Sequence, residues 1–159
     1  MIIREYKSED REGVEKCLFE LQEEEYARQP DYWQTPEKTI KDKYLDYLLK
    51  WMSDSGGKLF VAEVDDRVVG YVAVAIDDGK DQSPSIAMKE LGYIPDFDVL
   101  REYQKQGIGK ELIKAAEEYL KVNNCNYVSL DVTEGNPALE FYHKQGYKDY
   151  SRNLKKKLD

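Results

Sequence analysis

Histidine and cysteine, the usual ligands of zinc, are scarce in this sequence. It contains a single histidine, His143, and two cysteines, Cys17 and Cys125, which lie far apart and outside the paired spacing of zinc ligands. The two could form one disulfide, but without an export signal we interpret both as reduced thiols of the core. The sequence therefore predicts no metal site.

Long apolar runs are also missing. No stretch approaches the roughly 20 apolar residues that a membrane-spanning helix needs. Residues 1–5 mix charged side chains with β-formers, which is not the pattern of a secretory signal. We therefore expect a cytoplasmic protein with no membrane partner.

Basic residues are too few to balance the acidic ones, and the formal net charge is −8. A chain this acidic repels a phosphate backbone unless its basic residues are segregated, so we expect no nucleic-acid partner. The compact basic run at residues 155–157 lies between Leu154 and Leu158, where a terminal strand and an exposed tail fit equally well. The overall field favours a cationic partner.

The chain has no internal repeat and no linker rich in glycine, serine or proline. Its 159 residues have the length of one ordinary domain, so we predict a single domain over residues 1–159. Hydrophobic spacing predicts the element order β-α-α-β-β-β-α-β-α-β, an α/β fold with a mixed sheet and helices on both faces. The predicted strands are 2–6, 59–64, 68–76, 93–100, 127–132 and the segment after 146; the helices begin near 14, 35, 107 and 136, and 77–90 is a loop.

The first informative segment is residues 99–110, where a strand leads through a glycine-containing turn into the clearest helix. Backbone N–H groups at a helix start have no internal partner, and the aligned peptide dipoles amount to about +0.5 charge there. Gly107 and Gly109 would let an anion approach this backbone, and Lys105 and Lys110 add positive charge. A pyrophosphate would suit this turn.

Tight packing explains a glycine pair before a helix equally well, because short motifs match often by chance. Two other nucleotide-binding motifs do not match. The dinucleotide-binding pattern requires a third glycine where Leu112 stands, and a P-loop requires serine or threonine where Glu111 stands.

The second informative segment is residues 136–147. Asn136 is a favourable N-cap, Pro137 suits a first helical turn, and Gly146 suits the position after the last one. Phe141 can face the sheet while Tyr142 points towards its edge. Because the chain has 13 tyrosines, Tyr142 could also be an amphipathic residue that merely packs at a helix end.

Together, in this order and spacing, the two segments resemble signatures of the GCN5-related N-acetyltransferase (GNAT) family. Residues 104–109 are similar to its Arg/Gln-x-x-Gly-x-Gly/Ala cofactor signature, in the glutamine form. Residues 136–147 are similar to its Asn-x-x-Ala-x-x-Phe-Tyr-x-x-x-Gly-Phe signature. One residue, Pro137, separates Asn136 from Ala138 where the family has two, and Tyr147 replaces phenylalanine.

The resemblance implies an acyl-CoA N-acyltransferase fold whose fourth and fifth strands part at a bulge, with acetyl-coenzyme A inserted between them. Pro95 fits a strand that is irregular there. Backbone groups of Phe97, Asp98 and Val99 would pair with pantetheine, and Asn136 would steady this arm from the other side. The pyrophosphate would be held by Gln104, Lys105, Gln106, Gly107, Ile108, Gly109 and Lys110.

Direct transfer to an amine requires a base for the ammonium proton and an acid for the leaving thiolate. By position Tyr142 matches the acid, and the Val99 N–H matches the oxyanion donor. Asp96 and Asp98 lie two apart on the parting strand, so they share a face near the thioester and are candidate bases. Glu134 is a third candidate, and all three carboxylates could instead be structural.

The acceptor would contact the segment between the first two helices, residues 23–33. Its acidic and aromatic residues, including Glu25, Tyr32 and Trp33, could bind a cationic amine through charge and cation–π contact. The same residues could instead form a solvated helix end that covers the core. We therefore predict an acetyl-CoA-dependent N-acetyltransferase that modifies a primary amine of a small cationic molecule.

Two alternatives stay open from the sequence. The protein could acetylate protein N-termini or lysines, or it could bind acyl-CoA without catalysis. The resemblance also allows a homodimer, because dimers are common among such relatives.

Overall fold

The computed structural model describes residues 1–77 and 91–158. A five-stranded sheet with the order β1-β2-β3-β4-β5 forms its centre. The first four strands are antiparallel to their neighbours, whereas β4 and β5 are parallel, so the sheet is mixed as predicted. The strands are β1 (Ile2–Glu5), β2 (Lys58–Val64), β3 (Arg67–Asp77), β4 (Leu91–Val99) and β5 (Tyr127–Ser129).

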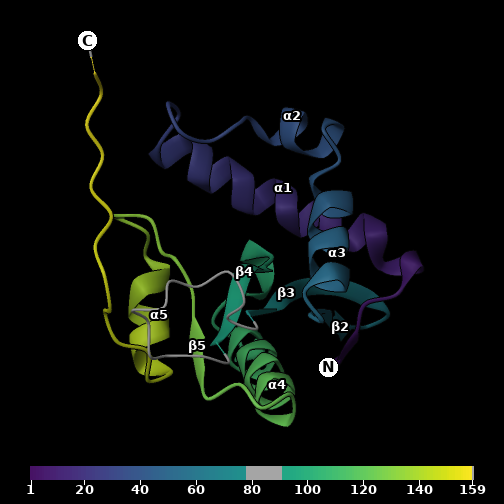
Figure 1. Ribbon diagram of the computed structural model, residues 1–159. Helices are drawn as coiled ribbons and strands as arrows, with labels where there is room; N and C mark the ends of the chain where they lie inside the picture. The colour runs from purple at the N-terminus through teal and green to yellow at the C-terminus, as the bar shows by residue number, and fades with distance from the viewer. Residues whose placement is uncertain (78–90, 159) are drawn as a thin grey trace.

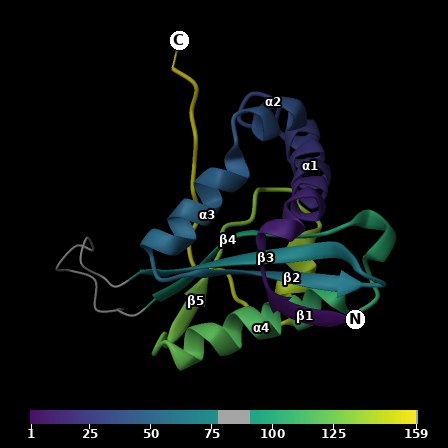
Figure 2. The same ribbon diagram turned by 90° about the vertical axis from the view of Figure 1, so that its right-hand side faces the viewer.

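Helices cover both faces of this sheet (Figures 1 and 2). Three helices, α1 to α3, lie on one face, and α4 lies across the other. The helix α5 packs beside the start of α4, beyond β5 (Figure 1). The helices are α1 (Arg11–Arg28), α2 (Pro36–Lys41), α3 (Tyr44–Asp54), α4 (Ile108–Val122) and α5 (Ala138–Lys144), with short 3-10 turns at Ser8–Asp10 and Arg101–Tyr103.

The helix α4 holds its face of the sheet through a continuous apolar stripe. Ile108, Leu112, Ala116 and Leu120 are all buried in the core, as the helical spacing predicts. Each fully buried leucine or isoleucine contributes about 1.5–3 kcal/mol relative to an exposed one. This burial fixes the start of α4, and with it the glycine turn, against the sheet.

The single helix predicted from residue 35 to residue 51 is two helices. Thr35 caps α2 as predicted, because its side chain accepts a hydrogen bond from the Lys38 N–H, and Pro36 follows in the first turn. The chain then breaks at Lys43, whose φ of 59° is left-handed. The hydrophobic spacing gives no sign of this break. The residue type gives none either, because a lysine rarely adopts a left-handed conformation.

The strand predicted at the C-terminus does not form. Residues 148–158 lie exposed along the surface, and Tyr150, Leu154 and Leu158 are all more than 80% exposed. A strand needs a neighbouring ladder, and this segment pairs with none of the described strands. The predicted loop at 77–90 lies outside the described residues beyond Asp77.

The feature that positions the site is the divergence of β4 and β5. Only Leu91, Gly92 and Tyr93 of β4 pair with β5. Immediately afterwards the register of β4 with β3 shifts, so that Ile94 and Pro95 together oppose one residue of β3, a β-bulge. Beyond the bulge β4 continues beside β3 alone, and the sheet opens between β4 and β5.

Candidate active site

The backbone of β4 beyond the bulge presents polar groups to this opening. The Leu100 N–H donates to the Val69 carbonyl of β3 over 2.9 Å. Because successive N–H groups of a strand point to opposite sides, those of Phe97 and Val99 point away from β3 and towards the opening. The Val99 carbonyl accepts a 2.9 Å hydrogen bond from the Gln104 side chain, which fixes the end of the strand to the following turn.

Asp96 lies on the face of β4 that α3 covers. Its carboxylate accepts a 2.8 Å hydrogen bond from the Tyr71 hydroxyl of β3, and the Tyr44 hydroxyl of α3 also favours its charged form. Burial raises the pKa of Asp96 to about 6, although the two phenols favour the charged form. At neutral pH this carboxylate is therefore largely ionised and able to accept a proton.

Asp98 lies on the same face, towards α1. Its Oδ2 atom is buried without a hydrogen-bond partner. Burial, opposed by the Val99 N–H and aided by the charges of Glu24 and Asp96, raises the pKa of Asp98 to about 8. Asp98 is therefore mostly protonated at neutral pH, which makes Asp96 the better base of the pair.

Tyr142 lies across the opening, on α5. It is 8% exposed and packs in an aromatic cluster, with ring centroids 5.3 Å from Phe141, 6.1 Å from Phe97 and 5.7 Å from Tyr147. Burial raises the pKa of Tyr142 above its usual value, and the negative charges of Asp96 and Asp98 add to the effect. The phenol therefore keeps its proton and lies near both carboxylates.

The glycine turn before α4 has a left-handed backbone at two positions. Lys105 has a φ of 61° and Gly107 a φ of 86°. A Cβ at Gly107 would meet nothing within 4 Å, so the turn is open on that side. Lys105 and Lys110 are exposed beside it. The N–H groups of the first turn of α4 therefore face a space that an anion could enter.

The other residues predicted to bind cofactor have internal roles. Gln106 donates to the Glu102 carbonyl over 3.1 Å. Ile108 is buried in the core, so only its backbone faces the turn. A Cβ at Gly109 would lie 3.1 Å from the Phe97 ring, so this glycine permits close packing. Asn136 directs its amide to Glu25 and to the Ala138 N–H.

The residues predicted to bind the acceptor separate into two groups. Glu25 is buried and bonded to Arg28, Thr133 and Asn136. Tyr32 is 56% exposed, and its ring contacts the Trp33 ring at 4.8 Å in a T-shaped arrangement. The third candidate base, Glu134, is exposed in the turn before α5, away from the buried pair.

Sequence reasoning missed the groups that support Asp96 and Glu25. Tyr71 is the only hydroxyl-bearing side chain within the buried run of residues 69–75. This exception could have signalled a buried polar partner. Tyr44 and Thr133 carry no comparable signal, because their partners are distant in sequence.

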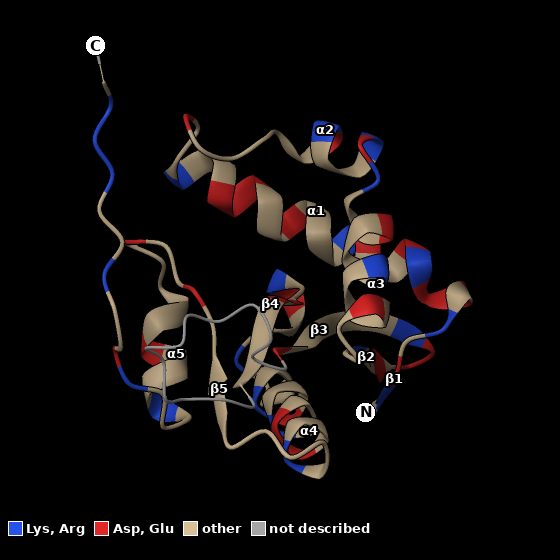
Figure 3. Ribbon diagram, in the orientation of Figure 1, with Lys and Arg blue, Asp and Glu red and all other residues tan. Residues whose placement is uncertain are grey.

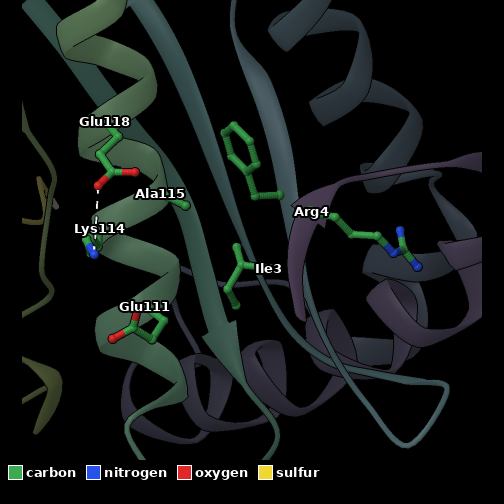
Figure 4. A pocket seen from close by; sticks show the side chains of 7 residues that line it. Ile3, Arg4, Glu111, Lys114, Ala115 and Glu118 are labelled. Atoms are coloured by element: carbon green, nitrogen blue, oxygen red, sulfur yellow. Dashed lines mark ion pairs between the residues drawn. The ribbon is translucent and has the colours of Figure 1, made fainter. Parts of the chain in front are cut away.

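Two surface hollows lie apart from this opening. One of about 230 Å³ is lined by Ile3, Phe60, Ala115 and charged residues of α4, where Lys114 pairs with Glu118 (Figure 4). Arg4 borders it but turns its guanidinium away, towards Asp10 and Glu63. The other, about 320 Å³, is lined by residues 47, 50, 51 and 54 of α3. Neither hollow contains a predicted site residue.

Within residues 1–77 and 91–158, no cluster of His, Cys, Asp and Glu could hold a metal ion. No helix of that same part of the chain is long and apolar enough to cross a membrane. Cys17 and Cys125 are both buried, as expected for thiols of the core.

A mixed sheet that opens between two parallel strands, with an anion-accepting turn and a carboxylate–phenol pair beside the opening, defines an acyltransferase class of fold. A model of the acetyltransferase (GNAT) family matches residues 17–147. The chain therefore belongs to the acetyltransferase (GNAT) family, and it is an acetyltransferase, as predicted. Acetyltransferases of this fold use acetyl-CoA.

Individual relatives agree with this membership. An uncharacterized N-acetyltransferase of Methanocaldococcus jannaschii is 33% identical over 151 residues, which cover 94% of this chain and 79% of that protein. An N-alpha-acetyltransferase of Saccharolobus solfataricus is 33% identical over 116 residues, 69% of this chain and 68% of that protein. A solved aminoglycoside N-acetyltransferase in complex with CoA has the same fold, with a TM-score of 0.68, 15% identity and 99% coverage of both chains.

Proposed function

We propose that this acetyltransferase binds acetyl-coenzyme A in the opening between β4 and β5 and acetylates a primary amine of a small cationic acceptor directly. The observation that carries the proposal is that Asp96 and Tyr142, on opposite sides of this opening, are close enough for the charge of Asp96 to raise the pKa of Tyr142. One is a carboxylate that can take a proton at neutral pH, and the other is a phenol that keeps its proton.

The residues present fit acetyl-coenzyme A. The N–H groups of Phe97 and Val99 point away from β3, where they also stabilise the Asp96 and Asp98 carboxylates, and they would pair with the pantetheine arm. The open side of Gly107, with Lys105 and Lys110 beside it, would receive the pyrophosphate. The cofactor supplies an acyl group activated as a thioester.

Asp96 would act as the base. A primary ammonium has a pKa of about 10.4, so on the order of one molecule in a thousand is nucleophilic at neutral pH. Asp96, directly or through a water, accepts the proton that the amine must lose. Tyr71 and Tyr44 hold its carboxylate in place during this transfer.

Tyr142 would act as the acid. Its hydroxyl holds the proton that the leaving sulfur needs, and its raised pKa keeps that proton on the hydroxyl at neutral pH. The surrounding rings of Phe97, Phe141 and Tyr147 hold the Tyr142 ring in place.

The acceptor side of the site favours a cation. Lys155 of the C-terminal segment places its Nζ 3.2 Å from the centroid of the Tyr32 ring, so this ring already binds an ammonium. Figure 3 shows acidic residues along α1 and basic residues along the C-terminal segment. Near the end of α1, Glu23, Glu24 and Glu25 share two cations, Arg28 and Arg101, which leaves an excess of negative charge.

A second candidate acceptor is the N-terminal amine of a protein. The relative from Saccharolobus solfataricus, an N-alpha-acetyltransferase, favours it. Such an amine needs the same base and acid, so Asp96 and Tyr142 would keep their roles.

Release of free thiol from acetyl-coenzyme A tests the proposal. Polyamines and aminoglycosides should be turned over, and each acceptor is paired with its fully N-acetylated form as a control. Peptides with free and blocked N-termini test the second candidate in the same assay. If neither the small-molecule amines nor the peptides were acetylated faster than acetyl-coenzyme A is hydrolysed, both acceptor assignments would be refuted. The cytoplasmic location and the homodimer stay predictions.

A further inference from the structure

The carboxylate of Glu25, in the last turn of α1, is 8% exposed and fully engaged within the protein. Its Oε1 atom accepts from the Asn136 amide over 2.9 Å and from Arg28 over 2.5 Å, and its Oε2 atom accepts from the Thr133 hydroxyl over 2.9 Å. These contacts join α1 to residues more than 100 positions later in the chain.

Thr133 and Asn136 are the two ends of one tight turn. The Asn136 N–H donates to the Thr133 carbonyl over 3.0 Å, and Gly135 between them has a φ of 80°, which a type II turn requires at its third position. Glu25 therefore accepts a side-chain hydrogen bond from each end of the turn that links β5 to α5.

The same turn starts α5. The side-chain oxygen of Asn136 accepts a 2.8 Å hydrogen bond from the Ala138 N–H, in the manner of a helix cap. Tyr142 follows Ala138 by four positions, about one helical turn later. A displacement of the turn would therefore carry Tyr142 with it.

The other end of this short helix is attached to β4 through aromatic rings. Phe141 stacks on Phe97 with centroids 5.7 Å apart and planes 11° apart. The helix α5 thus has two tethers. One joins it to β4 through Phe97, and the other joins the turn before it to α1 through Glu25. The distance between these tethers sets where the Tyr142 hydroxyl lies relative to Asp96.

We propose that Glu25 is a positioning residue for Tyr142. Its place in an acidic segment suggested that it binds the acceptor, and this proposal replaces that role. This inference rests on the proposed function of Tyr142 as the acid. A mispositioned acid lowers the rate of the chemical step, whereas loss of an acceptor-binding charge weakens acceptor binding. The two roles therefore separate in steady-state kinetics.

The test compares Glu25→Gln with Glu12→Gln, which removes the same charge from an exposed residue in the first turn of α1. For Glu25→Gln we expect kcat to fall roughly 10- to 100-fold, because small displacements of catalytic groups are costly. The KM for the acceptor should change less than about threefold. Glu12→Gln should keep the wild-type kcat. A raised acceptor KM with an unchanged kcat for Glu25→Gln would overturn the inference.

Thr133→Val supplies a milder variant that removes one donor at nearly constant volume. It should lower kcat in the same direction, and the double variant with Glu25→Gln should lose less than the product of the single losses, because both act through one contact. Independent, multiplicative losses would contradict the proposed coupling.

Hydrogen exchange gives a readout that does not need activity. In Glu25→Gln the amides of residues 136 and 138–142 should exchange at least about tenfold faster than in the wild type, while those of α4 keep their rates. Wild-type exchange in that segment would overturn the inference even if no acceptor were turned over. A wild-type protein that shows no acetyl transfer, with faster exchange in the variant, would instead refute the proposed function alone.

Discussion

Tyr71 donates a 2.8 Å hydrogen bond from β3 to the Asp96 carboxylate on the neighbouring strand, and both side chains are buried. A buried carboxylate without such a donor would be driven to its neutral form. The phenol of Tyr71 offsets part of this effect, so the pKa of Asp96 rises only to about 6. The contact therefore leaves a carboxylate that is charged at neutral pH and still basic enough to take a proton.

The first prediction concerns the pH dependence of acetylation. A base must be deprotonated to act, so kcat/KM should be at its plateau above the pKa of Asp96 and fall as the pH drops through about 6. Tyr71→Phe removes a donor that stabilises the charged form of Asp96, so the midpoint of this fall in kcat/KM should move to higher pH. Initial rates between pH 5 and pH 9 provide the measurement.

Asp98 is the control for this profile, because its pKa is raised to about 8. Asp96→Asn should lower kcat by about 100-fold or more, as expected for loss of a general base, whereas Asp98→Asn should retain most of the rate. If kcat/KM instead fell around pH 8, and this fall disappeared in Asp98→Asn, Asp98 would be the base.

The second prediction concerns the acid. Tyr142→Phe keeps the ring in its cluster with Phe97 and Phe141 and removes only the hydroxyl. We expect kcat to fall by about 100-fold or more, with the affinity for acetyl-coenzyme A nearly unchanged, because the hydroxyl acts only as the sulfur leaves. Steady-state kinetics and calorimetry measure the two quantities. An unaltered kcat would remove Tyr142 from the mechanism.

The third prediction separates backbone strain from cofactor binding at Gly107. Alanine at its φ of 86° should cost about 1–2 kcal/mol of stability. Gly56→Ala is a matched control, because Gly56 also has a positive φ, 65°, and open space around it, but lies far from α4's first turn in the sequence. Thermal unfolding should show a similar loss for both variants.

Affinity for coenzyme A should distinguish these two variants. If the Gly107 turn receives the pyrophosphate, Gly107→Ala disturbs N–H groups that bind a charged ligand. Each such bond contributes about 1.5–3 kcal/mol, which corresponds to tenfold or more in Kd. Gly56→Ala should bind coenzyme A as the wild type does. Equal affinities for all three proteins, measured by calorimetry, would refute this placement of the pyrophosphate.

The predictable part of the molecule is the part specified by local signals. The stripe from Ile108 to Leu120 predicts α4 because its spacing follows the helical period, and Thr35-Pro36 marks the start of α2 because capping depends on neighbouring residues. The opening between β4 and β5 was expected from the family resemblance, and the irregular position of Pro95 agrees with it.

The unpredicted part depends on distant partners. Glu25 looks like a member of a solvated acidic run, and only the fold brings it to Thr133 and Asn136. Likewise, the segment after Gly146 was predicted to form a strand, but strand formation requires a ladder that no local pattern specifies. The break at Lys43 depends on a backbone conformation that lysine adopts rarely, so composition gives no sign of it.

The last prediction concerns the cation that Tyr32 already holds. If the Tyr32 ring contributes to binding of a cationic acceptor, Lys155 competes with that acceptor for the ring. An exposed cation–π contact is worth about 0.5–1 kcal/mol, so Lys155→Ala should lower the acceptor KM roughly two- to fivefold at constant kcat. Lys157→Ala removes the same charge two residues further along and should leave the KM near its wild-type value. Equal effects of the two variants would indicate that only the net charge of the segment matters, and Tyr32→Leu should then leave the acceptor KM unchanged.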